Sequence, residues 1–306
     1  MRILITGGTG YIGTALTSTL LERNDVEEVI VFDNLSKQNY NFFLGHTYSN
    51  KEKLTFIEGD LLDSRSLKQA LDGVDVVYHL AAKVTTPFAN SDPHFFEQVN
   101  HWGTAELVYA LEESKVKKLI YAGSTSVYGS SKEEVTEGTE PNPRTFYGIS
   151  KMRGEEHVQR LVDKMDTYIL RCGNVYGYNK SMRFDAVINR FMFEANCNGR
   201  ITIHGNGKQG RAFIHIDLLT KVLKEIAFNE VEKGTYNVVD RNLSVLDLVD
   251  VMKEIYPELE YLFINQHLKL RELRVSQDSA LRSQIDYTNE RSLKDELLDF
   301  KERFSF

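Results

Sequence analysis

A glycine-rich turn near the start of the sequence constrains the fold of this chain more than any other feature. Gly7, Gly10 and Gly13 recur at every third position, directly after an apolar segment at residues 2–6 and before a segment with helical spacing. In a strand-turn-helix unit, such glycines permit a tight turn, a close approach of the backbone to a pyrophosphate, and tight packing of the helix on its strand. The helix N-terminus adds free N–H groups and the positive end of the helix dipole. The turn therefore predicts a Rossmann domain that binds a dinucleotide.

The first half of the chain alternates apolar runs with amphipathic segments, which indicates a β-α-β-α order. Strands are predicted at residues 2–6, 29–32, 54–57, 74–80, 118–122 and 167–171. Helices are predicted near residues 11–22, 64–72, 94–114 and 147–163. The strand segments are almost continuously apolar, which is typical of a parallel sheet covered by helices on both faces. We therefore predict an α/β fold with a doubly wound parallel sheet.

The regular alternation ends near residue 173. Beyond it, the pattern predicts a helix at residues 186–195 and isolated strands at 201–203, 235–239 and 261–264. We expect residues 1–173 to form the NAD-binding Rossmann domain, with returns of the chain near residues 211–240. Residues 174–210 and 241–306 are expected to form a smaller mixed α/β lobe that binds substrate.

The charge and cysteine content limit the kinds of partner and site. The formal net charge is −7 at pH 7, so no overall positive field attracts nucleic acid or an anionic membrane. No apolar run reaches the about 18 residues of a membrane span, and the apolar stretch at the N-terminus is too short for a signal peptide. Cys172 and Cys197 show neither disulfide density nor metal-ligand spacing. We expect a cytoplasmic protein without a metal site, in which both thiols are reduced and structural.

An acidic residue after the second predicted strand indicates which dinucleotide binds. Asp33 lies 20 residues after Gly13, where a carboxylate accepts hydrogen bonds from ribose hydroxyls and repels a 2′-phosphate. NAD is therefore favoured over NADP. Asp60 and Leu61 close the third predicted strand, where the adenine would lie. The alternative for both aspartates is a purely local role in a turn or cap.

Tyr147 and Lys151 are four residues apart on a predicted helix and therefore lie on one face of it. A phenol is a poor base at neutral pH, but a nearby cation lowers its pKa. Ser124 follows the fifth predicted strand at the carboxyl edge of the sheet, where such folds bind ligands. Its hydroxyl can hydrogen-bond a reacting oxygen beside Tyr147. Taken alone, the tyrosine and the lysine could instead be a surface pair on a helix.

The sequence as a whole resembles the extended short-chain dehydrogenases/reductases that act on nucleotide-diphosphate sugars, and among them the sugar 4-epimerases most closely. The motifs that carry the resemblance are Gly7-x-x-Gly10-x-x-Gly13, Asp33-Asn34-Leu35, Gly59-Asp60, His79-Leu80-Ala81-Ala82, Asn100-x-x-Gly103-Thr104, Ser124 through Gly129, Tyr147-x-x-x-Lys151, Arg171-x-x-Asn174-Val175-Tyr176-Gly177 and Arg211-x-Phe213-Ile214-His215-Ile216-Asp217. The resemblance implies that NAD is the cofactor and that Ser124, Tyr147 and Lys151 are catalytic. The residues expected to bind NAD are Gly7, Gly10, Tyr11, Ile12, Gly13, Asp33, Asn34, Asp60, Leu61, Leu80, Ala81, Ala82, Asn100, Tyr147 and Lys151.

The substrate side of the site is inferred from charge and from the same resemblance. A diphosphate carries about two negative charges, which an acidic protein must neutralise with local donors. By resemblance, Arg211 and Asn174 contact the phosphates; the alternatives are a solvated surface arginine and an asparagine that satisfies its own turn. A second arginine is expected from the C-terminal lobe, either Arg271 or Arg274. The predicted substrate-binding residues are Ser124, Thr125, Asn174, Arg211 and Arg274.

The resemblance also implies a reaction, in which Tyr147 removes the proton of the sugar C4 hydroxyl while C4 gives its hydride to the cofactor. In the family's 4,6-dehydratases an Asp-Glu pair follows the serine or threonine, because dehydration needs an acid and a base. Thr125 and Ser126 occupy those places here, and Asp33 disfavours the reductases, which generally use NADPH. Epimerisation at C4 is therefore favoured. The alternatives are another NAD-linked nucleotide-sugar enzyme, such as a 4,6-dehydratase, 3,5-epimerase or reductase, and a non-catalytic NAD sensor.

Two further expectations concern a loop and the assembly. After Gly177 the chain lacks the proline-rich turn that many relatives have at residues 178–185, so the substrate-facing loop is expected to be atypical. The resemblance implies a homodimer formed through the helices at residues 94–114 and 147–163.

Overall fold

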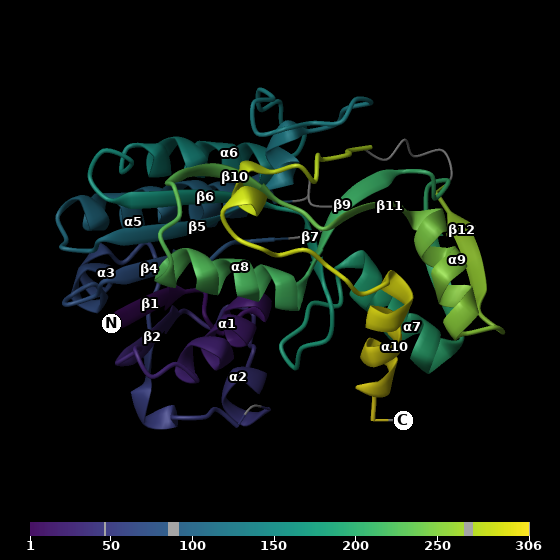
Figure 1. Ribbon diagram of the computed structural model, residues 1–306, viewed down its shortest axis with the longest axis horizontal. Coiled ribbons are helices and arrows are strands. Elements are labelled where there is room, and N and C mark those ends of the chain that lie inside the picture. Colours follow the sequence, from purple (N-terminus) through teal and green to yellow (C-terminus); the bar gives the residue numbers. More distant parts are fainter. Residues whose placement is uncertain (46, 85–91, 266–271, 306) are drawn as a thin grey trace.

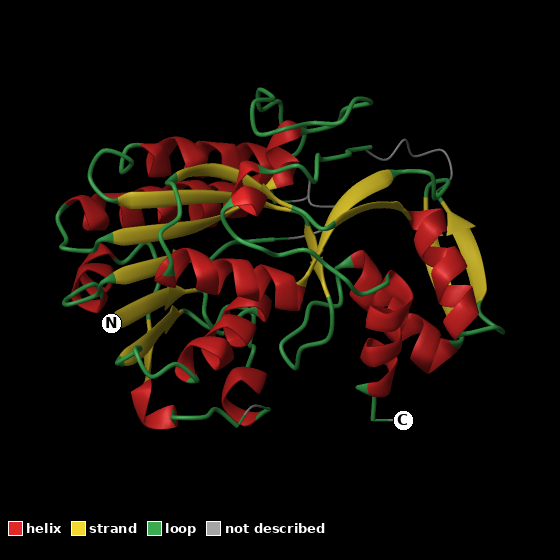
Figure 2. Ribbon diagram, in the orientation of Figure 1, coloured by secondary structure: helices red, strands yellow, loops and turns green. Residues whose placement is uncertain are grey.

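The chain folds into a large α/β layer structure with a smaller lobe beside it (Figure 1). A computed structural model describes residues 1–45, 47–84, 92–265 and 272–305. In the view of Figure 2, the strands of the large part run between layers of helices, and the smaller lobe carries its own helices and strands.

A seven-stranded parallel sheet forms the centre of the large part. Its strands are β1 (Arg2–Thr6), β2 (Glu28–Asp33), β3 (Leu54–Glu58), β4 (Val76–His79), β5 (Lys118–Ser124), β6 (Asp166–Cys172) and β10 (Gly234–Val238). The strand order is β10-β6-β5-β4-β1-β2-β3, and every neighbouring pair is parallel. The order reverses between β1 and β4, which is the point where open α/β sheets bind their ligands. The predicted doubly wound fold is confirmed.

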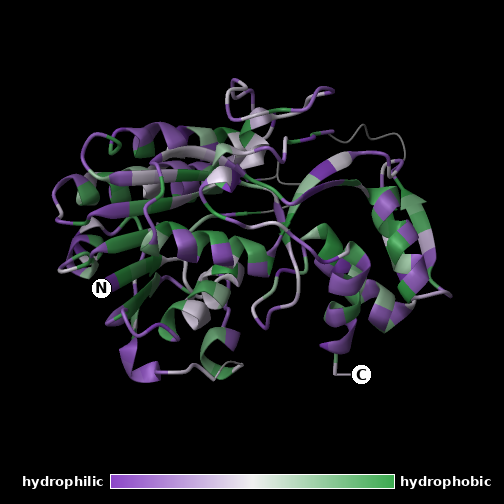
Figure 3. Cartoon of the chain, in the orientation of Figure 1, coloured by the Kyte–Doolittle hydropathy of each residue, from purple (hydrophilic) through white to green (hydrophobic). Residues whose placement is uncertain are grey.

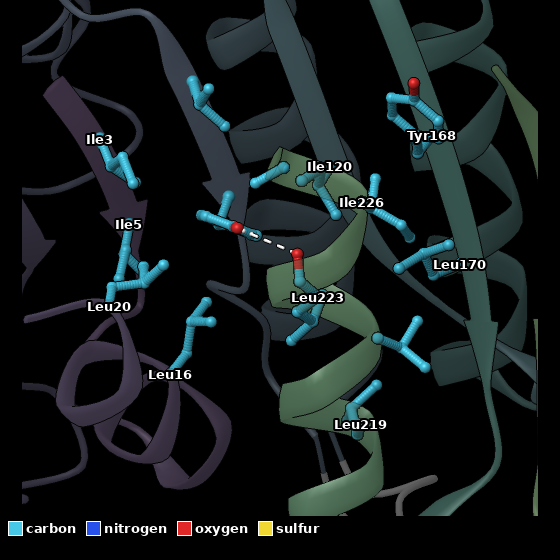
Figure 4. Close-up of a cluster of buried hydrophobic side chains, with 14 of the residues drawn as sticks. Ile3, Ile5, Leu16, Leu20, Ile120, Tyr168, Leu170, Leu219, Leu223 and Ile226 are labelled. Carbon is cyan, nitrogen blue, oxygen red and sulfur yellow. Dashed lines mark hydrogen bonds between the residues drawn. The ribbon is translucent and has the colours of Figure 1, made fainter. Parts of the chain in front are cut away.

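Two layers of helices cover the sheet because its strands are apolar on both faces. On one face lie α1 (Tyr11–Leu21) and α8 (Ile216–Phe228), and on the other α3 (Ser64–Ala70), α5 (Gly103–Glu112) and α6 (Phe146–Gln159). Alternation along β1 illustrates this, since Ile3 and Ile5 pack toward α1 and α8 whereas Leu4 packs toward the other layer. Figure 4 shows the cluster of buried hydrophobic side chains between the sheet and the layer formed by α1 and α8. The buried hydroxyl of Tyr78 finds a partner there by donating to the carbonyl of Leu223, at 3.0 Å.

The smaller lobe has its own hydrophobic core and two small sheets. One sheet has the order β11-β9-β7, and the other pairs β12 with β8. Its elements are β7 (Asn174–Tyr176), α7 (Val187–Asn198), β8 (Arg200–His204), β9 (Gly210–His215), β11 (Arg241–Ser244), α9 (Val245–Ile255), β12 (Glu260–Ile264) and α10 (Leu293–Glu302). In Figure 3 its helices alternate hydrophobic and hydrophilic segments, as expected for helices with one buried face.

Short helical segments complete the chain. They are α2 (Asn41–Leu44), η1 (Lys51–Lys53), α4 (Pro93–Phe96), the π-helical turn η3 (Glu97–Trp102), η4 (Thr125–Tyr128) and η5 (Ala280–Ser283). The predicted helix at 94–114 is thus one α4-η3-α5 run with a π turn inside it. No helix in the described ranges is long and apolar enough to cross a membrane.

The structure corrects two predictions about the second half. Residues 235–239 were expected to form an isolated strand, but β10 pairs with β6 and extends the main sheet. No strands were predicted at β7, β9 and β11, which together make the sheet between the two parts.

Candidate cofactor and active site

The glycine turn between β1 and α1 has no room for side chains. Gly7 has a φ of +71°, and a Cβ on it would lie 2.5 Å from the Cα of Ala81. A Cβ on Gly13 would lie 2.5 Å from the Cα of Gly8. Helix α1 begins at Gly10, which offers no side-chain acceptor to the N–H groups of the first turn. These groups have no intrahelical partner, so the turn fits the pyrophosphate of a dinucleotide.

The first two residues of α1 have different roles. Ile12 lines the large cavity described below. Tyr11 is buried, and its hydroxyl donates to the carbonyl of Gly177 at 2.5 Å. This bond ties the helix that follows the glycine turn to the loop after β7. Contact of Tyr11 with the cofactor stays a prediction.

Asp33 lies at the end of β2, directly beside the glycine turn. Its Oδ2 accepts the N–H of Thr9 at 3.1 Å, and its Oδ1 accepts the N–H of Leu35 at 2.9 Å. The local role that the sequence left as an alternative is therefore present. A carboxylate has about four lone-pair sites, so two backbone contacts leave acceptor capacity for ribose hydroxyls.

The neighbouring adenine-side residues form a short polar pair. Asn34 donates from Nδ2 to Oδ2 of Asp60 at 2.7 Å, and both residues are exposed. Leu61 is buried, and its Cδ1 would lie 3.0 Å from a Cβ on Gly103. Leu61 thus packs against the start of α5, while Asn34 and Asp60 present polar atoms to solvent at the edge of the sheet.

A large cavity opens at the carboxyl ends of β4, β5 and β6, between the sheet and the smaller lobe. The predicted residues that line it are Ile12, Leu80, Ala82, Ser124, Thr125, Tyr147, Lys151, Asn174 and Arg211. The structure therefore brings the predicted catalytic residues together with two predicted phosphate ligands.

Ser124 and Tyr147 meet inside this cavity. Ser124 ends β5, and its Oγ accepts the N–H of Ser126 at 3.2 Å, which begins the turn η4. The Ser124 hydroxyl lies close enough to Tyr147 to lower the pKa of the phenol. Tyr147 lies in the first turn of α6, which begins at the Thr145 cap. The strand end and the helix start thus fix the two hydroxyl groups against each other.

The pKa of Tyr147 differs in direction from the sequence-based expectation. Burial raises it above its ordinary value, and the Ser124 hydroxyl and the charge of Arg183 lower it only in part. A lowering by Lys151 was expected from their four-residue spacing, but burial is the dominant influence.

Lys151 is almost completely buried, at 2% exposure. Its ammonium lies 4.1 Å from the centroid of the Tyr121 ring, in a cation–π arrangement. Burial lowers the pKa of Lys151 to about 8, and the charge of Glu155 opposes this lowering. The lysine therefore titrates close to the physiological range.

Asn100 stands behind the cavity wall. It is fully buried in the π turn. Its Oδ1 accepts the N–H of Lys83 at 2.8 Å. Its Nδ2 donates to Ser150 Oγ at 3.0 Å and to the Lys83 carbonyl at 3.0 Å. The amide therefore links the segment after β4 to α6. Ala81 of the same segment meets the glycine turn through its backbone. Direct contact of Asn100 with the cofactor stays a prediction.

The residues predicted to bind substrate lie in different places in the structure. Asn174 begins β7 and lines the cavity, and its Nδ2 donates to the carbonyl of Ala212 in β9 at 2.9 Å rather than to a turn of its own. Thr125 is buried and donates to the carbonyl of Cys172 at 3.3 Å. Arg274 is exposed beside Gly210 and is not among the described residues that line the cavity. Arg271 lies outside the described residues.

The sequence did not single out two arginines of the cavity. Arg183, in the loop after β7, pairs with Asp185 through two bonds of 2.9 and 2.8 Å. Arg190 lies on α7 and also lines the cavity. The atypical loop at residues 178–185 could have indicated that Arg183 faces the substrate. Arg190 lies in an ordinary amphipathic helix pattern, which gives no such indication.

Comparison with known proteins places this geometry among sugar-nucleotide enzymes. The model of the family described as "NAD dependent epimerase/dehydratase family" matches residues 3–238. The protein of Homo sapiens named dTDP-D-glucose 4,6-dehydratase is 30% identical, with 96% of this chain and 80% of that protein covered. The putative UDP-glucose 4-epimerase of Methanocaldococcus jannaschii is 29% identical, with 82% and 81% covered.

A solved structure agrees over almost the full length. The UDP-glucuronic acid 4-epimerase from Bacillus cereus, in complex with UDP-glucuronic acid and NAD, has a TM-score of 0.85 and 26% identity. The match covers 99% of this chain and 98% of that one.

Proposed function

This chain belongs to the NAD dependent epimerase/dehydratase family, and from this membership we propose that it epimerises a nucleotide-diphosphate sugar at C4. The observation that carries the proposal is the placement of Ser124, Tyr147 and Lys151 in one cavity beside the glycine turn, with Lys151 one helical turn after Tyr147. NAD is the cofactor. The turn at residues 7–13 would hold its pyrophosphate, and Asp33 its adenosine ribose.

The side chains of the site have distinct tasks in this proposal. Tyr147 accepts the proton of the C4 hydroxyl, and Ser124 holds that oxygen beside it. Lys151 provides the positive charge that stabilises the Tyr147 phenolate before it accepts this proton, and would donate to the nicotinamide ribose. Bound NAD would supply the hydride acceptor for C4 and, once the 4-keto sugar has turned within the cavity, the hydride donor for its other face. Tyr147 then gives the proton back.

The cavity also supports the choice of epimerisation over dehydration. Thr125 and Ser126 have hydroxyl groups where dehydration needs an acid and a base. Among the described residues that line the cavity, Asp185 is the only carboxylate, and Arg183 holds both of its oxygens. The 4,6-dehydratase of Homo sapiens is nevertheless similar in sequence, so dehydration is the second candidate.

Arg190 and Arg211 line the cavity on the side of the smaller lobe. We propose that they bind the diphosphate, with Asn174 at its edge. This assignment replaces Arg274 with Arg190, because Arg274 lies on the exposed surface and Arg190 faces the cavity.

We also propose a cytoplasmic homodimer that forms through α5 and α6. Trp102 and Tyr109 are 54% and 40% exposed on this helical surface. His101 stacks on Trp102 at 4.7 Å and on His157 of α6 at 5.2 Å, so the two helices share one aromatic surface. Large exposed aromatic side chains that gather on one surface are typical of a covered interface.

The reaction is tested by incubating the purified protein with a panel of UDP-, GDP-, CDP- and dTDP-sugars and analysing the products by chromatography and mass. An isomer of unchanged mass is expected from one of them. Loss of water would replace the proposal with dehydration. Absence of turnover on the whole panel would favour an NAD sensor.

A further inference from the structure

A buried ion pair lies behind the catalytic helix, outside the residues assigned so far. Glu155 of α6 accepts two bonds at Oε2 from Arg171 of β6, from Nε at 3.1 Å and from Nη2 at 2.9 Å. Their side chains are only 3% and 7% exposed. Burying two charges is costly unless geometry and further hydrogen bonds compensate. This cost suggests that the pair has a role in the function of the protein.

Contacts on the arginine side fix the position of the carboxylate. Nη1 of Arg171 donates to the hydroxyl of Tyr128 at 3.0 Å, and that hydroxyl donates to Oδ1 of Asn237 at 2.8 Å. The guanidinium is therefore tied to η4 and to β10. Glu155 cannot swing away without breaking this buried chain of bonds.

The other carboxylate oxygen lies beside Gly123, near the end of β5. Oε1 of Glu155 is buried and has no hydrogen-bond partner among the described residues. It would lie 3.0 Å from a Cβ on Gly123, the residue before Ser124. A side chain at 123 would push the carboxylate away, so the glycine permits its approach to the end of β5.

Lys151 is the cation nearest in sequence on the same face of α6, because Glu155 follows it by four residues. Among the described residues, titratable groups near Lys151 lie on its own helix and on three strands: Tyr147 on α6, Tyr121 on β5, Cys172 on β6 and His79 on β4. Burial raises the pKa of Cys172 to about 12 and lowers that of His79 to about 3, so both are neutral near pH 7. Glu155 is thus the carboxylate that acts on this ammonium.

We propose that Glu155 is a positioning residue of the active site, whose carboxylate, held at one oxygen by Arg171, keeps the buried ammonium of Lys151 protonated. Because Arg171 holds Oε2 and Oε1 makes no hydrogen bond with a described residue, the carboxylate acts on Lys151 through its charge and leaves the N–H donors of the lysine available to the cofactor side. The inference rests on the proposed role of Lys151, but it concerns a property of the protein that can be measured without turnover.

The test measures the titration of Lys151 by NMR in the full-length protein labelled with ¹³C at lysine Cε, at equal NAD occupancy in all samples. Lys151→Met identifies the resonance. We expect Lys151 to titrate near pH 8 in the unaltered chain, and Glu155→Gln to lower this midpoint by about one pH unit or more. Glu156→Gln is the matched control, since it removes the same charge from the next residue, which is exposed. It should leave the midpoint within about a third of a unit.

The alkaline limb of kcat should move with the NMR midpoint in Glu155→Gln, and activity should recover at lower pH, which a merely structural defect would not produce. An unchanged Lys151 midpoint in folded Glu155→Gln overturns the proposal. If Glu155→Gln does not fold, the double variant Glu155→Gln with Arg171→Met removes both buried charges. It should still lower the midpoint of Lys151, because Glu155 is the charged group that raises the pKa of this lysine. A shifted midpoint without turnover on any sugar would refute the proposed reaction and leave this inference intact.

Discussion

The hydroxyl of Tyr147 is the group whose removal tests the chemistry most directly. Tyr147→Phe keeps the ring and the packing of α6 but removes the proton acceptor. We expect kcat to fall by roughly 10²–10⁴ while the affinity for NAD stays unchanged, as measured by steady-state kinetics and by titration with NAD. A variant that keeps its full rate would show that another group takes the proton.

The titration of Lys151 predicts the pH dependence of the rate. Burial lowers its pKa to about 8, so the ammonium is present below this pH and is lost as the pH rises through it. We expect kcat to decline with a midpoint near pH 8, measured in buffers of constant ionic strength. A rate that stays level through roughly pH 10, the reference range of an exposed lysine, would mean that the charge of Lys151 is not needed.

Sequence reasoning worked at the residue scale where a role depends on local spacing. Tyr147 and Lys151 share a face of one helix, and Ser124 ends a strand that was itself predictable, so their convergence in one cavity followed. Arg183 and Arg190 come from a loop and a helix of the smaller lobe. Their approach depends on how the two parts pack, which no local pattern encodes.

At the scale of elements, the turn between β1 and α1 is the least tolerant of change. A methyl group on Gly13 would lie 2.5 Å from the Cα of Gly8, so Gly13→Ala must move α1 off its strand. We expect a loss of about 1–3 kcal/mol in the free energy of unfolding and at least a tenfold weaker affinity for NAD, followed by denaturant unfolding and NAD titration.

Gly138→Ala is the matched control for this prediction. Gly138 is exposed, and the nearest atom to a Cβ on it is Thr136 Oγ1, at 3.8 Å. Stability and NAD affinity should therefore not change. If Gly13→Ala behaved like this control, the close packing at the turn would not be what the fold or the cofactor requires.

The helices and strands that could be predicted are those in which apolar residues recur with a clear helical or strand spacing. Five of the six apolar strands predicted in residues 1–173 are mostly buried, β3 is half-buried, and the order of strands and helices gave the parallel sheet. Strands β7 and β11 are short, all of Arg241–Ser244 is half-buried, and β9 mixes buried with half-buried positions. Pairing with strands far away in the sequence stabilises them, so their own sequences give little indication that they form strands.

At the scale of the whole molecule, the exposed aromatic surface predicts the assembly. Trp102→Glu places a charge on the surface formed by α5 and α6, and should convert the dimer into a monomer because a buried, unpaired charge is costly. Light scattering coupled to size-exclusion chromatography measures the mass. Leu44→Glu, at a residue 84% exposed on α2, is the control and should remain dimeric. A monomeric unaltered protein would refute this interface.

The pairing of β10 with β6 also has a consequence for biosynthesis. A ribosome makes β6 first, and then β7, α7, β8, β9 and α8, before β10 emerges. Until then β6 is an open edge of a parallel sheet in the nascent chain, and such edges invite aggregation. The first 173 residues contain the glycine turn and all three side chains proposed to be catalytic. A chain that stopped there would nevertheless expose this edge and lack α8, which covers the sheet beside α1.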